Sequence, residues 1–258
     1  MTATTAPAAL LAPARPPLGR LVAVELRKMV DTRSGRWLLV LIAVAGVALM
    51  PVVLFTVDEP DQSVVELFVA SQTGAAILLP VLGILSVTAE WSQRTALSTF
   101  ALVPERNRVL TAKLAAGTVL AAVFLVLGIA VAVLTRALGG ALGRSGGSWS
   151  LPASLVGTML LFTVLMVMMG AAFGMLFMNS PVAIVLYFVL PSLWSTLGEM
   201  IQRLKGPAGW LDTNRTLDVL TQEGVSGGEW ARIGASLAVW LLLPLAAGAV
   251  RLARREVK

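Results

Sequence analysis

The sequence predicts an all-α integral membrane protein with six transmembrane helices, preceded by an amphipathic N-terminal helix at the membrane interface. Hydrophobic residues make up 57% of the chain and charged residues only 13%, which is about half the charged fraction of a soluble globular domain. The charges are also clustered, because five stretches contain no Asp, Glu, Lys or Arg: residues 37–57, 67–89, 114–135, 145–198 and 233–250. Such runs leave too little polar surface to cover a soluble particle.

Each charge-free run can hold at least one crossing, since about 20 apolar residues span the hydrocarbon core of a bilayer. The run 145–198 has 54 residues and is interrupted by Asn179-Ser180-Pro181, so it divides into two spans. We therefore expect a disordered tail over residues 1–17 and a six-span domain over residues 18–258. Its spans are expected at about 37–57, 67–89, 114–135, 152–178, 182–198 and 233–250.

The distribution of Lys and Arg between the loops predicts the orientation of the chain, because cytoplasmic loops carry an excess of basic residues. The two terminal flanks and the loop 90–113 share one side and collect fourteen of the twenty basic residues, against six on the other side. Both termini are therefore expected in the cytoplasm. This bias also explains the net charge of +6 without a nucleic-acid partner, for which no basic folded module is left.

The segment 18–33 has the spacing of an amphipathic helix lying along the membrane surface. Its apolar face carries Leu18, Leu21, Val22, Leu26, Met29 and Val30, and Arg20, Arg27 and Asp31 lie opposite. Glu25 falls inside the apolar stripe, an unusual place for a carboxylate. Two interpretations remain open: a local pair with Lys28 three residues later, or a pair with a partner protein or with a basic residue of the loop 90–113.

The loop 90–113 has the sequence EWSQRTALSTFALVPERNRVLTAK and carries six charged residues between two long apolar runs. Residues 96–103 predict a short helix, which Pro104 ends because proline disfavours a helical residue before it. The charged turn Glu105-Arg106-Asn107-Arg108 then leads into the third span. A helix and turn at the membrane surface provide a contact for a cytoplasmic partner.

The composition excludes several kinds of active site. The chain has no cysteine and no histidine, which removes disulfides, thiolate chemistry and the commonest general base and metal ligand. It contains no G-x-x-x-x-G-K-[ST] phosphate loop. The charge-free spans offer no ionisable coupling site of the kind found in proton- or ion-driven transporters. We therefore expect a protein that is not an enzyme and whose energy comes from a separate subunit.

The loop pattern resembles that of a known family. In order, the loop carries Glu90, Thr95, a Leu-rich stretch, Pro104, Arg108 and Ala112-Lys113. These positions resemble the loop between the second and third spans of the permease subunits of type-2 ABC exporters, the bacterial drug-, lipid- and peptide-export kind. The chain departs from that pattern at Arg94, where the family usually has glycine. The resemblance covers about residues 18–255.

The resemblance implies a role for each part of the chain. Residues 18–33 become the cytoplasmic elbow helix, with Glu25, Arg27 and Lys28 on it. Residues 199–232 become an extracytoplasmic segment of re-entrant or lid-like helices, with Trp210 and Trp230 at the headgroups. The loop 90–113 becomes the ATPase-coupling loop, and its candidate coupling residues are Glu90, Arg94, Thr95, Phe100, Pro104, Glu105, Arg106, Arg108 and Lys113.

The implied function is export of a hydrophobic or amphiphilic substrate (a drug, lipid or antimicrobial peptide) across the bacterial plasma membrane by alternating access. The implied partners are two copies of an ABC ATP-binding subunit, a second permease and the lipid bilayer. ATP and Mg²⁺ are expected on the ATPase, and no cofactor on this chain. The alternative is a channel-like or scaffold membrane protein that is not driven by ATP. A gene for an ATP-binding subunit beside this one would favour the exporter.

Gly170 and Gly174 form a small-xxx-small pair, which allows two helices to approach closely. The sequence leaves open whether this pair packs inside the chain or against a second permease.

Overall fold

The computed structural model of the chain describes residues 15–56, 62–93, 95–103 and 105–254, without the side chains of Ala96, Phe100 and Ala253. Helices and no strands are found in these ranges. Six of the helical segments are long and apolar enough to cross a membrane. The predicted multi-pass, all-α membrane protein is therefore confirmed at this level, and most of the tail predicted over residues 1–17 lies outside the described residues.

The six candidate spans lie where the charge-free runs place them. They are α2 (Arg33–Thr56), α3 with α4 (Val64–Ser71 and Thr73–Ser92), α6 (Arg106–Ala141), α7 (Ala153–Phe177), α8 (Ser180–Met200), and a last segment made of α11 (Gly227–Leu237), the π-helical stretch η3 (Ala238–Leu242) and α12 (Leu243–Arg254). A further helix, α1 (Leu18–Asp31), precedes them.

The helices extend beyond the charge-free runs because charged side chains at their ends are paired. The third span was predicted over 114–135, whereas α6 begins at Arg106 and includes two buried basic residues, Lys113 and Arg136. The Arg136 guanidinium donates hydrogen bonds to the carbonyl oxygens of Ser145 (2.6 Å) and Gly147 (2.6 Å). The helix α6 therefore extends beyond the predicted span at both ends, and the position of the membrane crossing within it stays a prediction.

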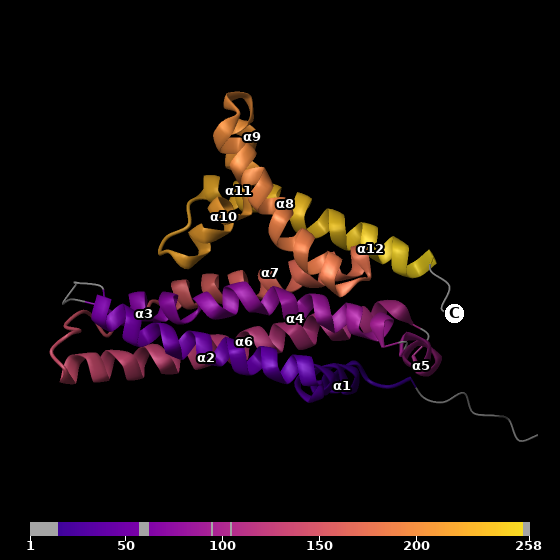
Figure 1. Cartoon of the computed structure of the whole chain (residues 1–258), viewed down its shortest axis with the longest axis horizontal. Helices are drawn as coiled ribbons and strands as arrows, with labels where there is room; N and C mark the ends of the chain where they lie inside the picture. The colour runs from indigo at the N-terminus through magenta and orange to yellow at the C-terminus, as the bar shows by residue number, and fades with distance from the viewer. Residues whose placement is uncertain (1–14, 57–61, 94, 104, 255–258) are drawn as a thin grey trace, which may run out of the picture.

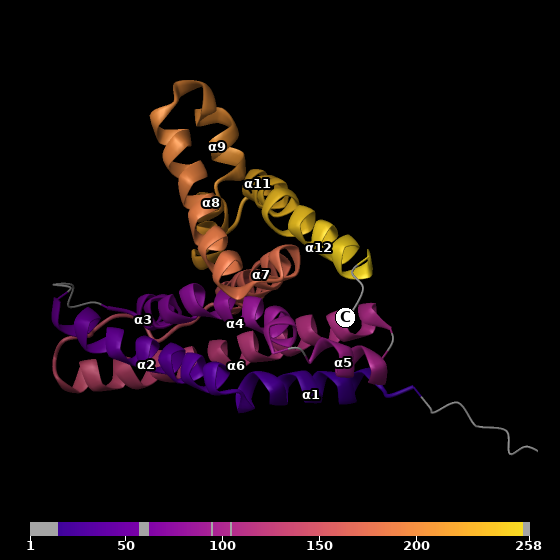
Figure 2. The same ribbon diagram turned by 45° about the vertical axis from the view of Figure 1, so that its right-hand side comes forward.

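The helices form two parts that meet at α7. In Figure 1, α2, the span formed by α3 and α4, and α6 run side by side as an elongated layer, and α7 packs along α4 and α6. Figure 2 shows α8 rising away from this layer and α11–α12 returning toward it. The far end of α12, the short helix α5 (Ala96–Leu102) and α1 lie at the same end of the molecule in both views. We call this end the loop end.

The segment 199–232, predicted to carry lid-like helices, contains α9 (Lys205–Leu211), α10 (Thr213–Asp218) and the start of α11. The buried carboxylate of Asp212 holds it to α8, because Ser195 Oγ donates a hydrogen bond to Asp212 Oδ2 at 2.8 Å. The Trp240 indole N–H donates to the carbonyl oxygen of Leu211 at 2.7 Å. Trp210 and Trp230 are about half exposed, and their placement at the lipid headgroups stays a prediction.

Glycines allow the close packing of α7 on α4. A Cβ at Gly170 would lie 2.1 Å from the carbonyl oxygen of Pro80, and a Cβ at Gly174 would lie 2.9 Å from that of Ile84. Both glycines are buried inside the chain. In this structure the pair thus packs against α4, and its part in contact with a second permease stays a prediction.

Gly170→Ala is expected to lower the free energy of unfolding by about 1–3 kcal/mol, the usual cost of overpacking a tight site. The added methyl group would push α7 off the backbone of α4. The matched control is Gly157→Ala on the same helix, where a Cβ meets nothing within 4 Å. Thermal unfolding in detergent should show a lower Tm for the first variant only, and equal Tm values would contradict the packing argument.

Candidate functional site

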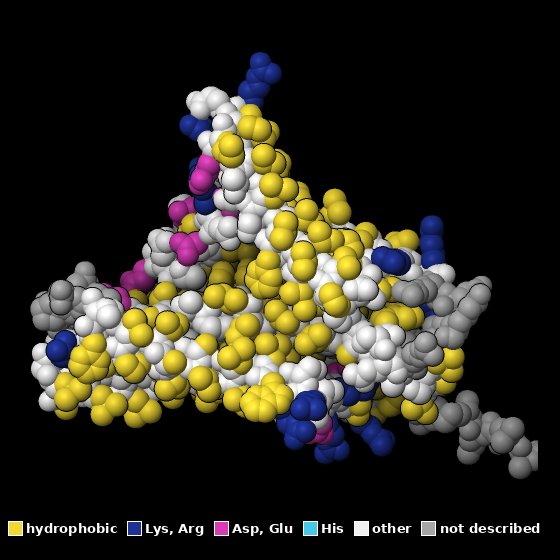
Figure 3. All heavy atoms as spheres, viewed as in Figure 1, with side chains coloured by type: hydrophobic (Ala, Val, Ile, Leu, Met, Phe, Trp, Pro, Cys, Tyr) yellow, Lys and Arg dark blue, Asp and Glu magenta, His cyan; other side chains and the backbone are white. Residues whose placement is uncertain are grey.

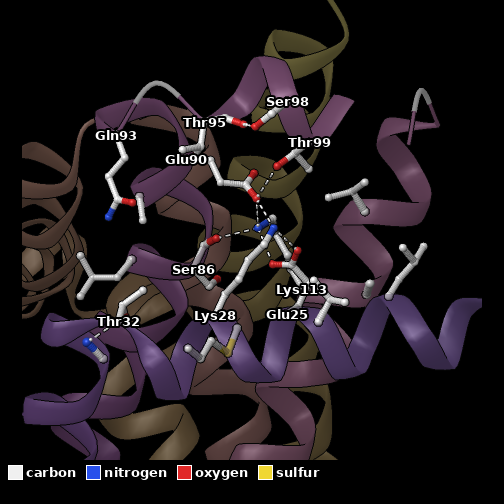
Figure 4. A pocket seen from close by; sticks show the side chains of 18 of the residues that line it. Glu25, Lys28, Thr32, Ser86, Glu90, Gln93, Thr95, Ser98, Thr99 and Lys113 are labelled. Atoms are coloured by element: carbon white, nitrogen blue, oxygen red, sulfur yellow. Dashed lines mark hydrogen bonds and ion pairs between the residues drawn. The ribbon is translucent and has the colours of Figure 1, made fainter. Parts of the chain in front are cut away.

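Four charged side chains from three helices meet at the loop end (Figure 4). Glu25 and Lys28 come from α1, Glu90 from the last turn of α4, and Lys113 from the third turn of α6. We call these four residues the ion cluster. Glu25, Glu90 and Lys113 are each 5–7% exposed as whole residues, whereas the Lys28 side chain is 40% exposed.

The two lysines and two glutamates alternate, so that each cation contacts both anions. Lys28 Nζ lies 2.7 Å from Glu25 Oε1 and 2.8 Å from Glu90 Oε1. Lys113 Nζ lies 2.6 Å from Glu25 Oε2 and 3.1 Å from Glu90 Oε1. The cluster thus has no net charge, which is the arrangement that makes burial of ionised groups tolerable.

Neighbouring polar groups complete the hydrogen bonding. Lys113 Nζ donates to the carbonyl oxygen of Ser86 on α4 at 2.9 Å, and Thr99 Oγ1 on α5 donates to Glu90 Oε1 at 3.3 Å. Burial by itself would lower the pKa of Lys28, but the hydrogen bonds and charges of Glu25 and Glu90 outweigh it and raise this pKa. Lys28 therefore stays a cation at neutral pH.

The local sequence explains how Glu25 comes to be buried. On α1, Glu25 and Met29 are one turn apart and face inward, and Lys28 lies beside them on the same side. Both interpretations of Glu25 hold, since it pairs locally with Lys28 and across 88 residues with Lys113 of the loop segment. The carboxylate in the apolar stripe is thus the α1 contribution to an internal network.

The short helix α5 sits over the cluster. Its predicted range, 96–103, agrees with the observed Ala96–Leu102 to within one residue. The backbone N–H of Thr95 donates to the carbonyl oxygen of Glu90 at 2.9 Å, and Thr95 in turn accepts the N–H of Thr99. Glu90 therefore holds α5 in two ways. Its backbone carbonyl accepts from the Thr95 N–H, and its carboxylate accepts from the Thr99 hydroxyl.

A cavity of about 500 Å³ lies between α1, the start of α2, α4, α5 and the start of α6. The ion cluster lines it, together with polar groups such as Thr32, Gln93 and Ser98 and apolar groups that include Leu82 and Leu102. It separates part of α5 from the helices beneath it. This leaves space for the loop to move against the bundle.

The structure divides the predicted loop residues into two groups. Glu90 and Lys113, two of the predicted coupling-loop residues, are buried, because each is held between two opposite charges. Thr95 is exposed and lines the cavity. Arg94, Pro104 and the side chain of Phe100 lie outside the described residues.

The remaining predicted residues lie around the cluster and not within it. Glu105 pairs with Arg15 at 3.0 Å and with Arg108 at 3.6 Å. Arg108 also donates to the carbonyl oxygen of Pro16, and Arg106 donates to that of Leu252 at the end of α12. Arg27 is exposed on the outer side of α1. The start of α6 is thus tied to both terminal segments.

Sequence reasoning missed Ser86 and Thr99, which join the cluster. A serine and a threonine in a hydroxyl-rich chain give no signal of their own. Leu102 lies within the predicted short helix and is 81% exposed.

The chemistry of the site is structural. Among the described residues, no group of three or more His, Cys, Asp or Glu side chains could hold a metal ion. Each carboxylate of the cluster is neutralised by two cations, which leaves no free base beside a bound molecule. The ion pairs fasten α1, α4 and α6 to one another, and Thr99 links α5 to them through Glu90.

No protein-family model matches the chain, and no curated protein matches it significantly. The resemblance to type-2 ABC permeases therefore depends on the loop pattern and the six-span topology.

Proposed function

We propose that the chain is the membrane-spanning permease subunit of an ATP-driven exporter of the type-2 ABC kind, located in the bacterial plasma membrane. Two copies of a separate ATP-binding subunit carry ATP and Mg²⁺, and a second permease completes the pathway. Both termini and the loop end face the cytoplasm, because these segments carry the excess of Lys and Arg that is typical of the cytoplasmic side. α1 then lies along the inner membrane surface as the elbow helix.

The ion cluster is the observation that carries this proposal. A coupling loop must pass a displacement to the spans, and here the two ends of the loop, Glu90 on α4 and Lys113 on α6, form ion pairs with each other and with α1. A loop that merely joined two spans would not require four ionised groups in a largely buried place, where their desolvation is costly. These contacts thus support a loop that transmits movement of the ATPase to the spans.

The outer surface of α5 supplies the contact for the ATPase. Leu97 and Leu102 are 54% and 81% exposed, although both are apolar and belong to a seven-residue helix. Apolar side chains presented on a short helix suit a groove in a partner protein. The flanking pair Glu105–Arg108 provides charges that set the register of that contact.

The transported molecule is hydrophobic or amphiphilic. The middles of the spans carry no ionised side chain, so the path through them offers apolar surfaces, hydroxyls and amides. Alternating access between inward- and outward-facing arrangements moves the substrate outward when the ATPases close.

The first test is to purify the tagged chain in mild detergent from cells that make its neighbouring proteins and to identify what stays bound. We expect an ATP-binding subunit in the eluate and ATP hydrolysis that depends on the permease. Glu105→Lys with Arg108→Glu, which reverses the surface charges and preserves their pairing, should keep the fold and weaken co-purification. A chain that purifies alone would instead favour the channel-like or scaffold alternative.

A further inference from the structure

A second cavity of about 400 Å³ lies away from the ion cluster, between α4, α7, α8 and α10. This volume is in the range of sites for small organic molecules, which run from about 300 to 1,000 Å³. Ile77 and Phe188 lie at its open side, 53% and 39% exposed. Figure 3 shows apolar side chains across this part of the molecule and acidic side chains gathered near α10.

The walls of the cavity are aromatic and sulfur-rich. Phe162, Met166 and Met169 line it from α7, and Tyr187 and Phe188 from α8. The rings of Tyr187 and Phe188 stand edge to face, with centroids 5.0 Å apart and planes at 90°. Aromatic faces are electron-rich and attract cations, while thioethers adapt to irregular apolar shapes.

The rim of the cavity carries one formal charge, the carboxylate of Asp218 on α10. Its hydrogen bonds come from neutral groups, Thr221 Oγ1 at 3.5 Å and Gln222 Nε2 at 3.1 Å. The nearest basic residue in sequence, Arg215, already pairs with Glu199 at 2.7 Å and Asp212 at 3.3 Å. Among the described residues, Asp218 forms no ion pair, and this region has an excess of negative charge.

Two prolines add backbone acceptors to the same walls. Pro80 in α4 and Pro191 in α8 have no N–H, so neither can donate the helical hydrogen bond to the carbonyl four residues earlier. Those earlier residues are Ala76 and Tyr187, and both line the cavity. Within the described ranges, the Tyr187 hydroxyl donates only to Met166 Sδ, at 3.6 Å, which is a weak acceptor.

We propose that this cavity binds a lipophilic organic cation, whose charge is met by Asp218 and by the faces of Tyr187 and Phe188, and whose apolar body fills the space beside Met166 and Met169. A lipophilic anion would meet the carboxylate of Asp218 and the acceptor carbonyls, and would be repelled. The transport role of the cavity rests on the proposed exporter function, whereas binding itself does not require the ATPase. The site therefore narrows the substrate to a positively charged amphiphile.

The test uses the purified full chain in nanodiscs of zwitterionic lipid, with tetraphenylphosphonium as the probe. Tetraphenylborate, which has the same shape and the opposite charge, is the control ligand, and empty nanodiscs correct for partitioning into lipid. We expect saturable binding of about one tetraphenylphosphonium per chain and no saturable binding of tetraphenylborate.

Two variants locate the site. Asp218→Asn keeps the size and one of the two accepted hydrogen bonds, and should weaken tetraphenylphosphonium binding about tenfold. Tyr187→Leu should weaken it about fivefold, while Tyr187→Phe, which keeps the ring, should not. The matched control is Glu223→Gln, an exposed carboxylate of the same segment that does not line the cavity.

Equal weakening by Asp218→Asn and Glu223→Gln would overturn the proposal, because it would show a general surface-charge effect. Saturable binding of both probes, or of neither, would also overturn it. Unchanged Tm values for the variants exclude misfolding as the cause. If the chain binds the cation in this way but never co-purifies with an ATPase, the site stands and the exporter function fails.

Discussion

Lys113→Met is expected to lower the free energy of unfolding by about 3–5 kcal/mol, the usual cost of removing one partner from a buried ion pair. Without this cation, Glu25 and Glu90 remain near each other with only Lys28 between them, and the carbonyl oxygen of Ser86 loses its donor. Unfolding can be followed by tryptophan fluorescence in mixed micelles with increasing sodium dodecyl sulfate. The midpoint should shift to markedly lower detergent fractions.

Two further variants show whether the loss comes from the ion cluster. Arg27→Met removes an exposed charge from the same region, outside the cluster, and should change stability little. The double variant Glu25→Gln with Lys113→Met leaves a single Lys28–Glu90 pair, and should be more stable than Lys113→Met alone, since contacting residues couple by about 0.5–3 kcal/mol. Strict additivity of the two changes would rule out the alternating arrangement as a source of stability.

Leu102→Asp is expected to weaken binding of the co-purifying ATPase about 30-fold, the equivalent of a 2 kcal/mol interface hot spot. The side chain is 81% exposed, so the change should leave the fold and Tm intact. A charge at this position places an unpaired carboxylate in an apolar contact. The dissociation constant of the ATPase from the permease in nanodiscs, and the ATP hydrolysis it supports, provide the two readouts.

The control for this change is Leu142→Asp, an equally apolar residue, 62% exposed, at the opposite end of α6. It should affect neither ATPase binding nor ATP hydrolysis. If both variants bind the ATPase as well as the unmodified chain does, α5 is not the contact, and the search moves to the exposed side of α1.

The sequence was sufficient to predict the six helical spans because the absence of charge over about 20 residues has few physical explanations other than lipid. It also predicted the short helix after Thr95 from its apolar run and from Pro104. The helix ends were predicted less well. Lys113 and Arg136 looked like boundaries, yet their partners allow them to be buried within α6.

The ion cluster was only partly predictable. The position of Glu25 in an apolar stripe indicated a buried partner, but its choice of Lys113 depends on how α1 crosses α6, which no local pattern encodes. Glu90 was predicted to open the charged loop, and its burial in the last turn of α4 was not foreseen. The second cavity depends on side chains from four helices and could not be found from any one of them.

The length of α6 has a mechanical consequence. Its 36 residues extend about 54 Å at 1.5 Å per residue, well beyond the roughly 30 Å of hydrocarbon. It contains no proline, whereas α2, α4 and α8 each have one inside the helix, where a bend is favoured. A stiff rod that tilts by about 5° around its midpoint moves each end by roughly 2.4 Å in opposite directions. A displacement of the ion-cluster end of α6 would thus be accompanied by a displacement of the Arg136 end in the opposite direction.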